Sequence, residues 1–242
     1  MQVRRYTIRE RPNSASIGDR FANLVLTDEI NHATPSKIAE RPAGSRMQRR
    51  QVTIGDVTYK MDDLFLVLAT RNPITGKAPT PCRKRRWTLL LKVLVDYPQP
   101  RRRASDCGPD DRRCSAGIRP VVSPQRILQA REAGGQAGLC GPKIKDYVLD
   151  LVRVTRRPGK NGLSILQNLV SFGASPRASI NLVLAARAYA FLQGRGFVTP
   201  DDVKQIAPDV LRHRIITSYE AEAENITSDH IVQRILDHTD VP

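Results

Sequence analysis

In this 242-residue sequence, three polar residues that follow apolar runs could bind a metal ion or act on phosphate: Asp28, Glu29 and Asn72. Asp28 and Glu29 lie near the end of the apolar run of residues 21–31, and Asn72 follows a second apolar run in residues 64–73. A carboxylate at the end of a strand can hold Mg²⁺, and its neighbour can polarise an attacking water. Taken alone, such acids more often only mark the place where a strand leaves the core. A neighbouring strand that presents an asparagine makes the combination more specific.

The elements that carry these residues have the composition of buried strands. Short apolar runs that end in polar residues are typical of parallel strands whose carboxyl ends face a ligand crevice. Residues 50–60 alternate on both sides of Gly55 and Asp56, which predicts a hairpin with a two-residue turn. The first part of the chain therefore predicts an α/β sheet.

The second part of the chain has helical periodicity. Residues 143–156 place Ile144, Tyr147, Val148, Leu151 and Val152 on one face of a helix. Further helices are predicted in residues 175–196, 199–215 and 227–239, where serine or threonine precedes each apolar pattern. We detect no strand pattern among them, so a small helical bundle is expected after the sheet.

The net positive charge of this chain comes mostly from five stretches, residues 1–16, 38–46, 76–88, 100–115 and 134–142. They hold 16 of the 39 lysines and arginines but 5 of the 24 acids, and they contribute most of the net charge of +15. All four cysteines, Cys82, Cys107, Cys114 and Cys140, also lie there. Their spacing contains no CxxC pair and no histidine is near, which disfavours a zinc site.

Several motifs between these stretches resemble one family. The segments "NLVLTDEINHATPSK", "FLVLATRNPI", "VLVDYP", "SFGASPRASINLVLAARAYAFLQGRGFVTPDDV" and "APDVLRHRI" look like successive motifs of the MoxR family of AAA+ ATPases. The resemblance implies an α/β fold, with a partial AAA+ P-loop NTPase sheet in residues 1–99. It also implies an all-α lid bundle in residues 100–242.

The resemblance also implies roles for individual residues. Asp28 and Glu29 match the Walker B pair, in which the first acid holds the Mg²⁺ of ATP. Asn72 matches sensor 1, and Arg177 matches the sensor 2 arginine that reaches ATP from the lid. Without the family match, Arg177 would be interpreted as an arginine on the solvated face of a helix N-terminus.

Two departures from the family pattern bear on catalysis. The sequence contains no G-x-x-x-x-G-K-[ST] loop, whose amides and lysine cradle phosphates, and it begins about twenty residues before Walker B. The family usually continues after sensor 1 with a segment resembling "EGQGTYPLPEAQMDRF", which contains a candidate arginine finger. Here residues 75–88 read "TGKAPTPCRKRRWT", and Arg71 stands where the family usually has glutamine.

The missing segment can be recovered by a change of reading frame. Codons exist for Lys77 to Thr88 that read GTYPLPEAQMD when translated from the third base of the lysine codon. In the same way Arg5–Ser16 can hide VYNPGTAEFRF, Ala39–Arg46 can hide QSALLEA, Arg102–Cys114 can hide AERAIVDRMTGA, and Ala137–Pro142 can hide QVYVD. Each hidden reading resembles the family at its position, so we interpret the five stretches as translated out of frame.

We therefore expect a fragment of an ATP-hydrolysing motor that is catalytically impaired by itself. The resemblance implies ATP and Mg²⁺ as cofactors, self-assembly into a ring that is usually a hexamer, and remodelling of partner proteins that often carry von Willebrand factor A domains. No run of 18 apolar residues occurs and no signal peptide is recognisable, so a cytoplasmic protein without a membrane span is expected.

Two alternatives remain open on sequence grounds. The first is a basic nucleic-acid-binding protein that uses Arg83, Lys84, Arg85 and Arg86 with Trp87 for stacking; the family motifs make a nucleic-acid partner the less favoured interpretation. The second is a non-catalytic interaction module that docks partners through the predicted lid.

Overall fold

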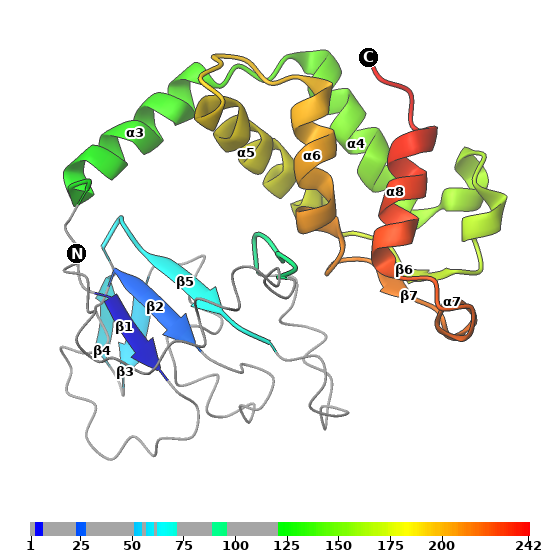
Figure 1. Cartoon of the computed structure of the whole chain (residues 1–242), viewed down its shortest axis with the longest axis horizontal. Coiled ribbons are helices and arrows are strands. Elements are labelled where there is room, and N and C mark those ends of the chain that lie inside the picture. Colours follow the sequence, from blue (N-terminus) through cyan, green and yellow to red (C-terminus); the bar gives the residue numbers. More distant parts are fainter. Residues whose placement is uncertain are drawn as a thin grey trace, which may run out of the picture.

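The structure is a computed structural model of the whole chain. It describes residues 3–6, 23–27, 51–54, 57–60, 62–71, 89–95 and 121–242. Figure 1 shows a small group of strands in the N-terminal part and an arch of helices in residues 121–242, which we call the helical region.

The N-terminal part contains a parallel sheet in the order β1-β2-β5. The strands are β1 (Val3–Tyr6), β2 (Leu24–Thr27) and β5 (Leu66–Ala69). The two strands predicted in residues 21–31 and 64–73 are confirmed, and they lie side by side. Strand β1 was not predicted, because its sequence VRRY falls in one of the five unusual stretches.

The predicted hairpin is also confirmed. Strands β3 (Gln51–Ile54) and β4 (Val57–Lys60) pair antiparallel, with Ile54 opposite Val57. This register leaves two residues for the turn, as Gly55-Asp56 predicts.

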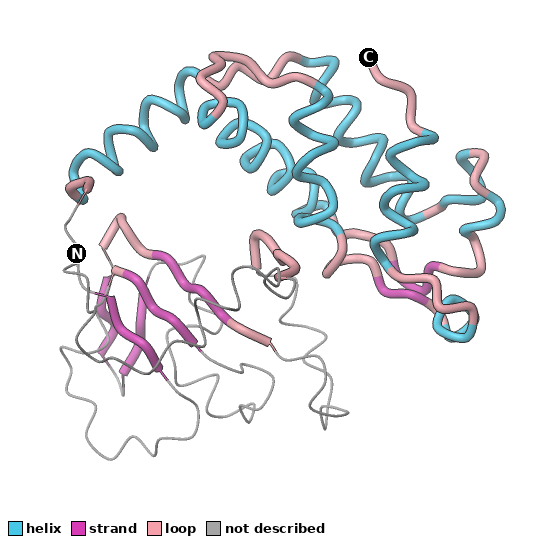
Figure 2. Tube along the Cα trace, viewed as in Figure 1, coloured by secondary structure: helices cyan, strands magenta, loops and turns pink. Residues whose placement is uncertain are grey.

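The helical region follows the predicted periodicity closely, and its helices and loops alternate along the tube of Figure 2. Its helices are α3 (Pro124–Ala137), α4 (Pro142–Arg156), α5 (Pro176–Leu192), α6 (Pro200–Leu211), α7 (Tyr219–Ala223) and α8 (Ser228–His238). Two short 3-10 helices, η5 (Pro158–Asn161) and η6 (Ser164–Leu166), follow α4.

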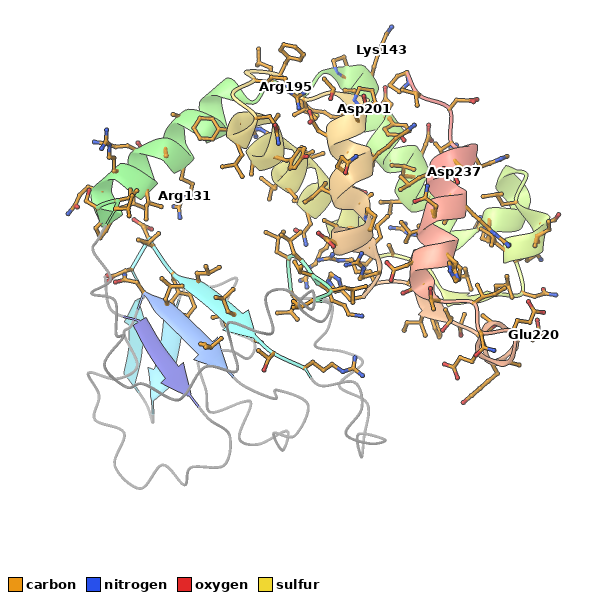
Figure 3. All side chains as sticks on the ribbon, in the orientation of Figure 1. Arg131, Lys143, Arg195, Asp201, Glu220 and Asp237 are labelled. Carbon is orange, nitrogen blue, oxygen red and sulfur yellow. The ribbon has the colours of Figure 1, made fainter. Side chains whose placement is uncertain are left out.

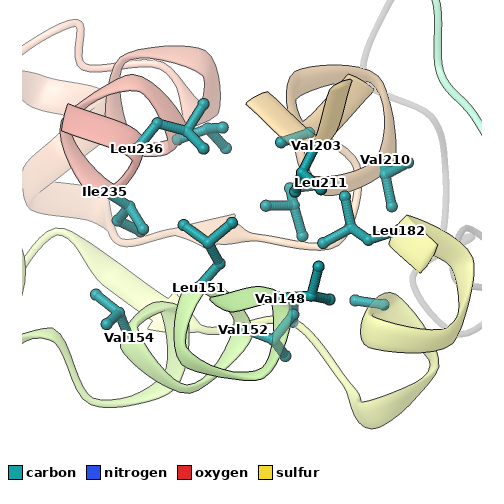
Figure 4. Close-up of a cluster of buried hydrophobic side chains, with 14 of the residues drawn as sticks. Val148, Leu151, Val152, Val154, Leu182, Val203, Val210, Leu211, Ile235 and Leu236 are labelled. Carbon is teal, nitrogen blue, oxygen red and sulfur yellow. The ribbon is translucent and has the colours of Figure 1, made fainter. Parts of the chain in front are cut away.

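Four helices build one core (Figure 4). The residues predicted to line the buried face of α4 do so, with Tyr147, Val148, Leu151 and Val152 nearly inaccessible and Ile144 packed at the margin. Leu182 from α5, Leu211 from α6 and Ile235 from α8 meet them. Burying each such side chain contributes about 1.5–3 kcal/mol, so this core holds the helices in place.

Two features of the helical region differ from the prediction. Strands β6 (Val170–Phe172) and β7 (Ile216–Thr217) form a short antiparallel sheet in a region expected to be purely helical. Each is too short to produce a visible alternation in the sequence. Helix α3 was also not predicted, although Ser123 caps it and Pro124 occupies its first turn, the same signal that predicted α5.

A polar cluster that includes Arg195 holds the start of α6, and Figure 3 labels Arg195 and Asp201 at this place. Thr199 and Asp202 form a reciprocal capping box, and the Arg195 guanidinium binds both carboxylate oxygens of Asp202. Burial alone would raise the pKa of Asp202, but the hydrogen bonds from Arg195 and Thr199 outweigh burial and lower the pKa. A charged Asp202 therefore fixes the turn between α5 and α6.

Candidate functional site

The edge of the parallel sheet brings the two predicted strand ends together. Thr27, the last residue of β2, pairs in register with Ala69, the last residue of β5. Asp28 follows Thr27 directly, and Asn72 follows Ala69 by three positions. Asp28, Glu29 and Asn72 themselves lie outside the described residues. The strands that precede them in the sequence, β2 and β5, nevertheless end at the same edge of the sheet. Parallel α/β sheets bind ligands at this edge.

Arg177 lies at the other candidate position, in the first turn of α5. Ser175 is the N-cap residue with an extended backbone, and Pro176 occupies the first turn, as predicted. The Ser175 side chain makes no capping hydrogen bond, however. Ser175 is therefore an N-cap only by its backbone conformation. The position of this turn has to be set by the residues that precede it.

Gly173 and Ala174 supply that position by packing against the end of α4. A Cβ on Gly173 would lie 2.3 Å from the carbonyl oxygen of Thr155, so only glycine fits this approach. The backbone N–H of Ala174 donates to Thr155 Oγ1 at 3.0 Å, and Arg156 Nε donates to the Ala174 carbonyl at 2.7 Å. Both Ala174 and Thr155 are fully buried.

The sequence pattern identified the "GASPRAS" block but gave no sign of its partners on α4. Thr155 donates its own hydroxyl proton to the Val152 carbonyl at 2.7 Å, which leaves the oxygen free to accept from Ala174. A threonine near a helix end makes such bonds in many proteins without any functional consequence, so the spacing of residues 155 and 174 carries no signal in the sequence.

Arg177 is exposed to solvent at this rigid turn. A helix N-terminus has unpaired N–H groups and a partial positive charge, and the guanidinium adds a full one. This end of α5 therefore fits an anionic phosphate group. The predicted Mg²⁺ ligand, Asp28, lies outside the described residues.

A metal cluster, a membrane span and the basic segment were the other features to locate in the described part of the chain. No group of three His, Cys, Asp or Glu side chains within it is placed to hold a metal ion. No helix of that part has the length and apolar character that crossing a bilayer demands. The basic residues 83–86 and Trp87, on which the nucleic-acid alternative depends, lie outside it.

Comparison with known proteins covers both parts of the chain. A family model described as "ATPase family associated with various cellular activities (AAA)" matches residues 3–84, and one described as "AAA lid domain" matches residues 163–235. A crystal structure of a candidate ATPase from Cytophaga hutchinsonii superposes with a TM-score of 0.80 at 34% identity, covering 93% of this chain and 68% of that one.

Three curated relatives extend the comparison. "Chaperone MoxR1" of Mycobacterium tuberculosis is 36% identical, over 93% of this chain and 59% of its own length. "Protein MoxR" of Paracoccus denitrificans is 34% identical, over 81% and 61%. "Uncharacterized protein YeaC" of Bacillus subtilis is 31% identical, over 93% and 67%. The chain thus spans about three fifths to two thirds of the length of these relatives.

The parallel sheet, the helical region and both family models define an AAA ATPase core followed by its lid. Within that class, the chain belongs to the MoxR family of AAA+ ATPases. The predicted family and fold class are confirmed.

Proposed function

We propose that this chain carries the Walker B, sensor 1 and sensor 2 elements of a MoxR-type ATPase that acts as a chaperone. The observation that carries the proposal is the in-register pairing of Thr27 with Ala69. The two acids and the asparagine follow, in the sequence, two strands that end at the same edge of the sheet.

Each residue has a distinct role in this proposal. Asp28 would hold Mg²⁺ on ATP, and Glu29 would polarise the water that attacks the γ-phosphate. Asn72 would orient that water or the phosphate from the adjacent strand. Arg177 would neutralise phosphate charge from the helical region, supported by its exposed place at the start of α5. Bound Mg²⁺ supplies charge stabilisation of the phosphoryl group during transfer.

We further propose that these 242 residues by themselves neither bind ATP tightly nor hydrolyse it. The amino-acid sequence contains neither the phosphate-loop motif nor the family's arginine segment after Asn72. The test is steady-state ATP turnover by the purified chain and by its Glu29→Gln variant. Turnover by the wild type that is lost in Glu29→Gln would refute the impairment and support the catalytic role of Glu29.

The site roles need a version of the chain in which catalysis can be restored. This version carries the five alternative readings and is preceded by a segment that contains a G-x-x-x-x-G-K-[ST] phosphate loop. We expect it to hydrolyse ATP, Glu29→Gln to abolish turnover while ATP binding persists, and Arg177→Ala to weaken both. Undiminished turnover in Glu29→Gln would overturn the assignment.

Ring formation and partner remodelling belong to the same proposal. AAA+ ATPases commonly assemble into rings, and one relative is named a chaperone. We expect the restored version to form a ring, with a hexamer as the first candidate, and to engage proteins that carry von Willebrand factor A domains. Light scattering with and without ATP measures the first expectation; a persistent monomer would contradict it.

The structure also bears on the reading-frame hypothesis, in residues 137–142. The alternative reading QVYVD places its last residue, Asp, at position 141, which is the N-cap of α4. Gly141 has the extended backbone of an N-cap but no side chain to make the capping bond, and Asp is among the preferred residues there. The alternative Val at position 140 would replace Cys140, which packs against the core.

One position in the same stretch fits less well. The alternative Val at 138 would require Arg187 to shift, because a Cβ on Gly138 lies 3.1 Å from the Cβ of Arg187. Sequencing the locus decides the matter: genomic bases that cannot encode QVYVD across Ala137–Pro142 would refute the hypothesis.

A further inference from the structure

Residues 89–95, which we call the connector, lie in the sequence between the sheet and the helical region. They follow β5 and precede α3, and Figure 1 shows them as a short green loop beside the lower end of α6. The family resemblance of "VLVDYP" placed this stretch with the AAA+ core, within residues 1–99. Its described hydrogen bonds, however, run to residues 209–214.

Three consecutive side chains hold the connector by its backbone. Arg212 Nη1 donates to the Lys92 carbonyl at 2.8 Å, and His213 Nε2 lies 3.1 Å from the Leu89 carbonyl oxygen. Arg214 donates from Nη2 to Leu89 O at 2.5 Å and from Nη1 to Leu90 O at 3.3 Å. We call Arg212, His213 and Arg214 the clamp.

A main-chain bond in the opposite direction completes the attachment. The N–H of Lys92 donates to the Asp209 carbonyl at 2.8 Å. Asp209 lies in the last turn of α6, where carbonyl groups lack a partner within the helix. The Lys92 N–H of the connector therefore pairs with a free carbonyl at the end of α6, and the clamp side chains pair with the connector carbonyls.

The clamp residues are themselves buried or hydrogen-bonded to the helical region. Arg214 is 1% exposed and also donates to the Val210 carbonyl, and within the described residues its guanidinium forms no ion pair with an acid. A buried guanidinium without an acid depends on carbonyl oxygens for stabilisation. Arg212 is held from the other side by Asp209 and Asp229, at 2.6 and 2.7 Å.

We propose that the clamp makes the connector a mechanical part of the helical region, so that the connector moves with α6 when the helical region moves relative to the sheet. In this arrangement the chain leaves the sheet after β5 and is anchored again at Leu89 by the clamp.

The functional consequence rests on the proposed ATPase function. In that proposal Arg177 neutralises phosphate charge from the helical region, to which the clamp also belongs. A nucleotide that repositions the helical region through Arg177 would thereby also move the connector. Arg212, His213 and Arg214 are positioning residues in this proposal, because none of them contacts nucleotide.

Hydrogen exchange on the full chain, without nucleotide, tests the attachment. We expect the Lys92 amide, which donates to the Asp209 carbonyl, to exchange as slowly as the amides at the end of α6. Arg214→Met should speed its exchange about tenfold or more while α4 and α8 stay protected. Unchanged connector exchange in a folded Arg214→Met variant would overturn the proposal.

A matched pair on the connector side covers the case in which Arg214→Met does not fold. Lys92→Pro removes the N–H that reaches Asp209 and leaves the helical region intact, whereas Lys92→Ala keeps it. Faster limited proteolysis within the connector in Lys92→Pro than in Lys92→Ala supports the proposal, and equal proteolysis of the two contradicts it. A repeat with ATP and Mg²⁺ concerns only the proposed function: no change with nucleotide would count against that function and leave the attachment standing.

Discussion

The Thr155 hydroxyl oxygen lies 3.0 Å from the backbone nitrogen of Ala174, and this hydrogen bond ties the end of α4 to the turn that starts α5. Both residues are fully buried. Three residues further along the chain, Arg177 is exposed. The exposed Arg177 guanidinium is thus carried by a turn whose backbone is buried and hydrogen-bonded to α4.

Thr155→Val tests this support with little change in side-chain volume. The variant leaves the buried N–H of Ala174 without a partner, which costs about 1–3 kcal/mol of unfolding free energy. Urea unfolding followed by circular dichroism measures the loss. Thr155→Ser retains the hydroxyl and should lose less. A Thr155→Val variant that is as stable as the wild type would show that this hydrogen bond does not contribute.

Gly173→Ala should disturb the same turn by steric contact. The added Cβ would meet the Thr155 carbonyl oxygen at 2.3 Å, so the backbone has to move, at a cost of roughly 1–3 kcal/mol. Gly135→Ala is the matched control, because nothing lies within 4 Å of its Cβ position in α3. We expect this control to gain roughly 0.5–1 kcal/mol. Thermal melts that move the two variants in the same direction would contradict this account.

His213 should make the stability depend on pH in weakly acidic solution. Burial, followed by the positive charge of Arg214, lowers the pKa of His213 from 6.5 to about 4. Between these values the unfolded chain binds a proton that the folded chain excludes, so stability falls as the pH decreases from 6.5 to 4. The loss attributable to this residue is about 2–3 kcal/mol.

The variant His213→Asn isolates this effect from the titration of carboxylates. Its unfolding free energy should decline less steeply than that of the wild type over the same pH range, as measured by urea titrations at several pH values. Parallel curves for the two proteins would show that His213 does not titrate in this range.

Gly141→Asp restores the side chain that the alternative reading frame supplies at the N-cap of α4. A carboxylate there can accept a hydrogen bond from the first turn and complement the helix dipole, a gain of roughly 0.5–1 kcal/mol. Gly141→Ala is the control and should gain nothing. A Gly141→Asp variant that melts no higher than Gly141→Ala would remove this structural support for the frame hypothesis.

The sequence predicted those parts of the fold in which periodicity and local signals agree. The apolar face of α4 and the hairpin around Gly55-Asp56 have the expected positions, because each depends on neighbours in the chain. Strand β6, with three residues, is formed by pairing with distant β7, so no local pattern reveals it.

The candidate site divides in the same way. Arg177 could be found from its motif and its place in the first turn of α5. Thr155 and the clamp could not be assigned, since their roles depend on contacts with Ala174 and with the connector, which lie far away in the sequence. Such contacts follow from packing of the core and are not encoded in the spacing of any short segment.

The clamp recognises carbonyl oxygens, which every amino acid possesses. Substitutions at Leu89 and Leu90 therefore leave its acceptors in place, and at position 92 any residue except proline also keeps the donor. The three clamp residues have no such latitude, because their side chains make the bonds. The connector residues can therefore be substituted more freely than the clamp residues. Covariation between the two segments would be a poor indicator of their contact.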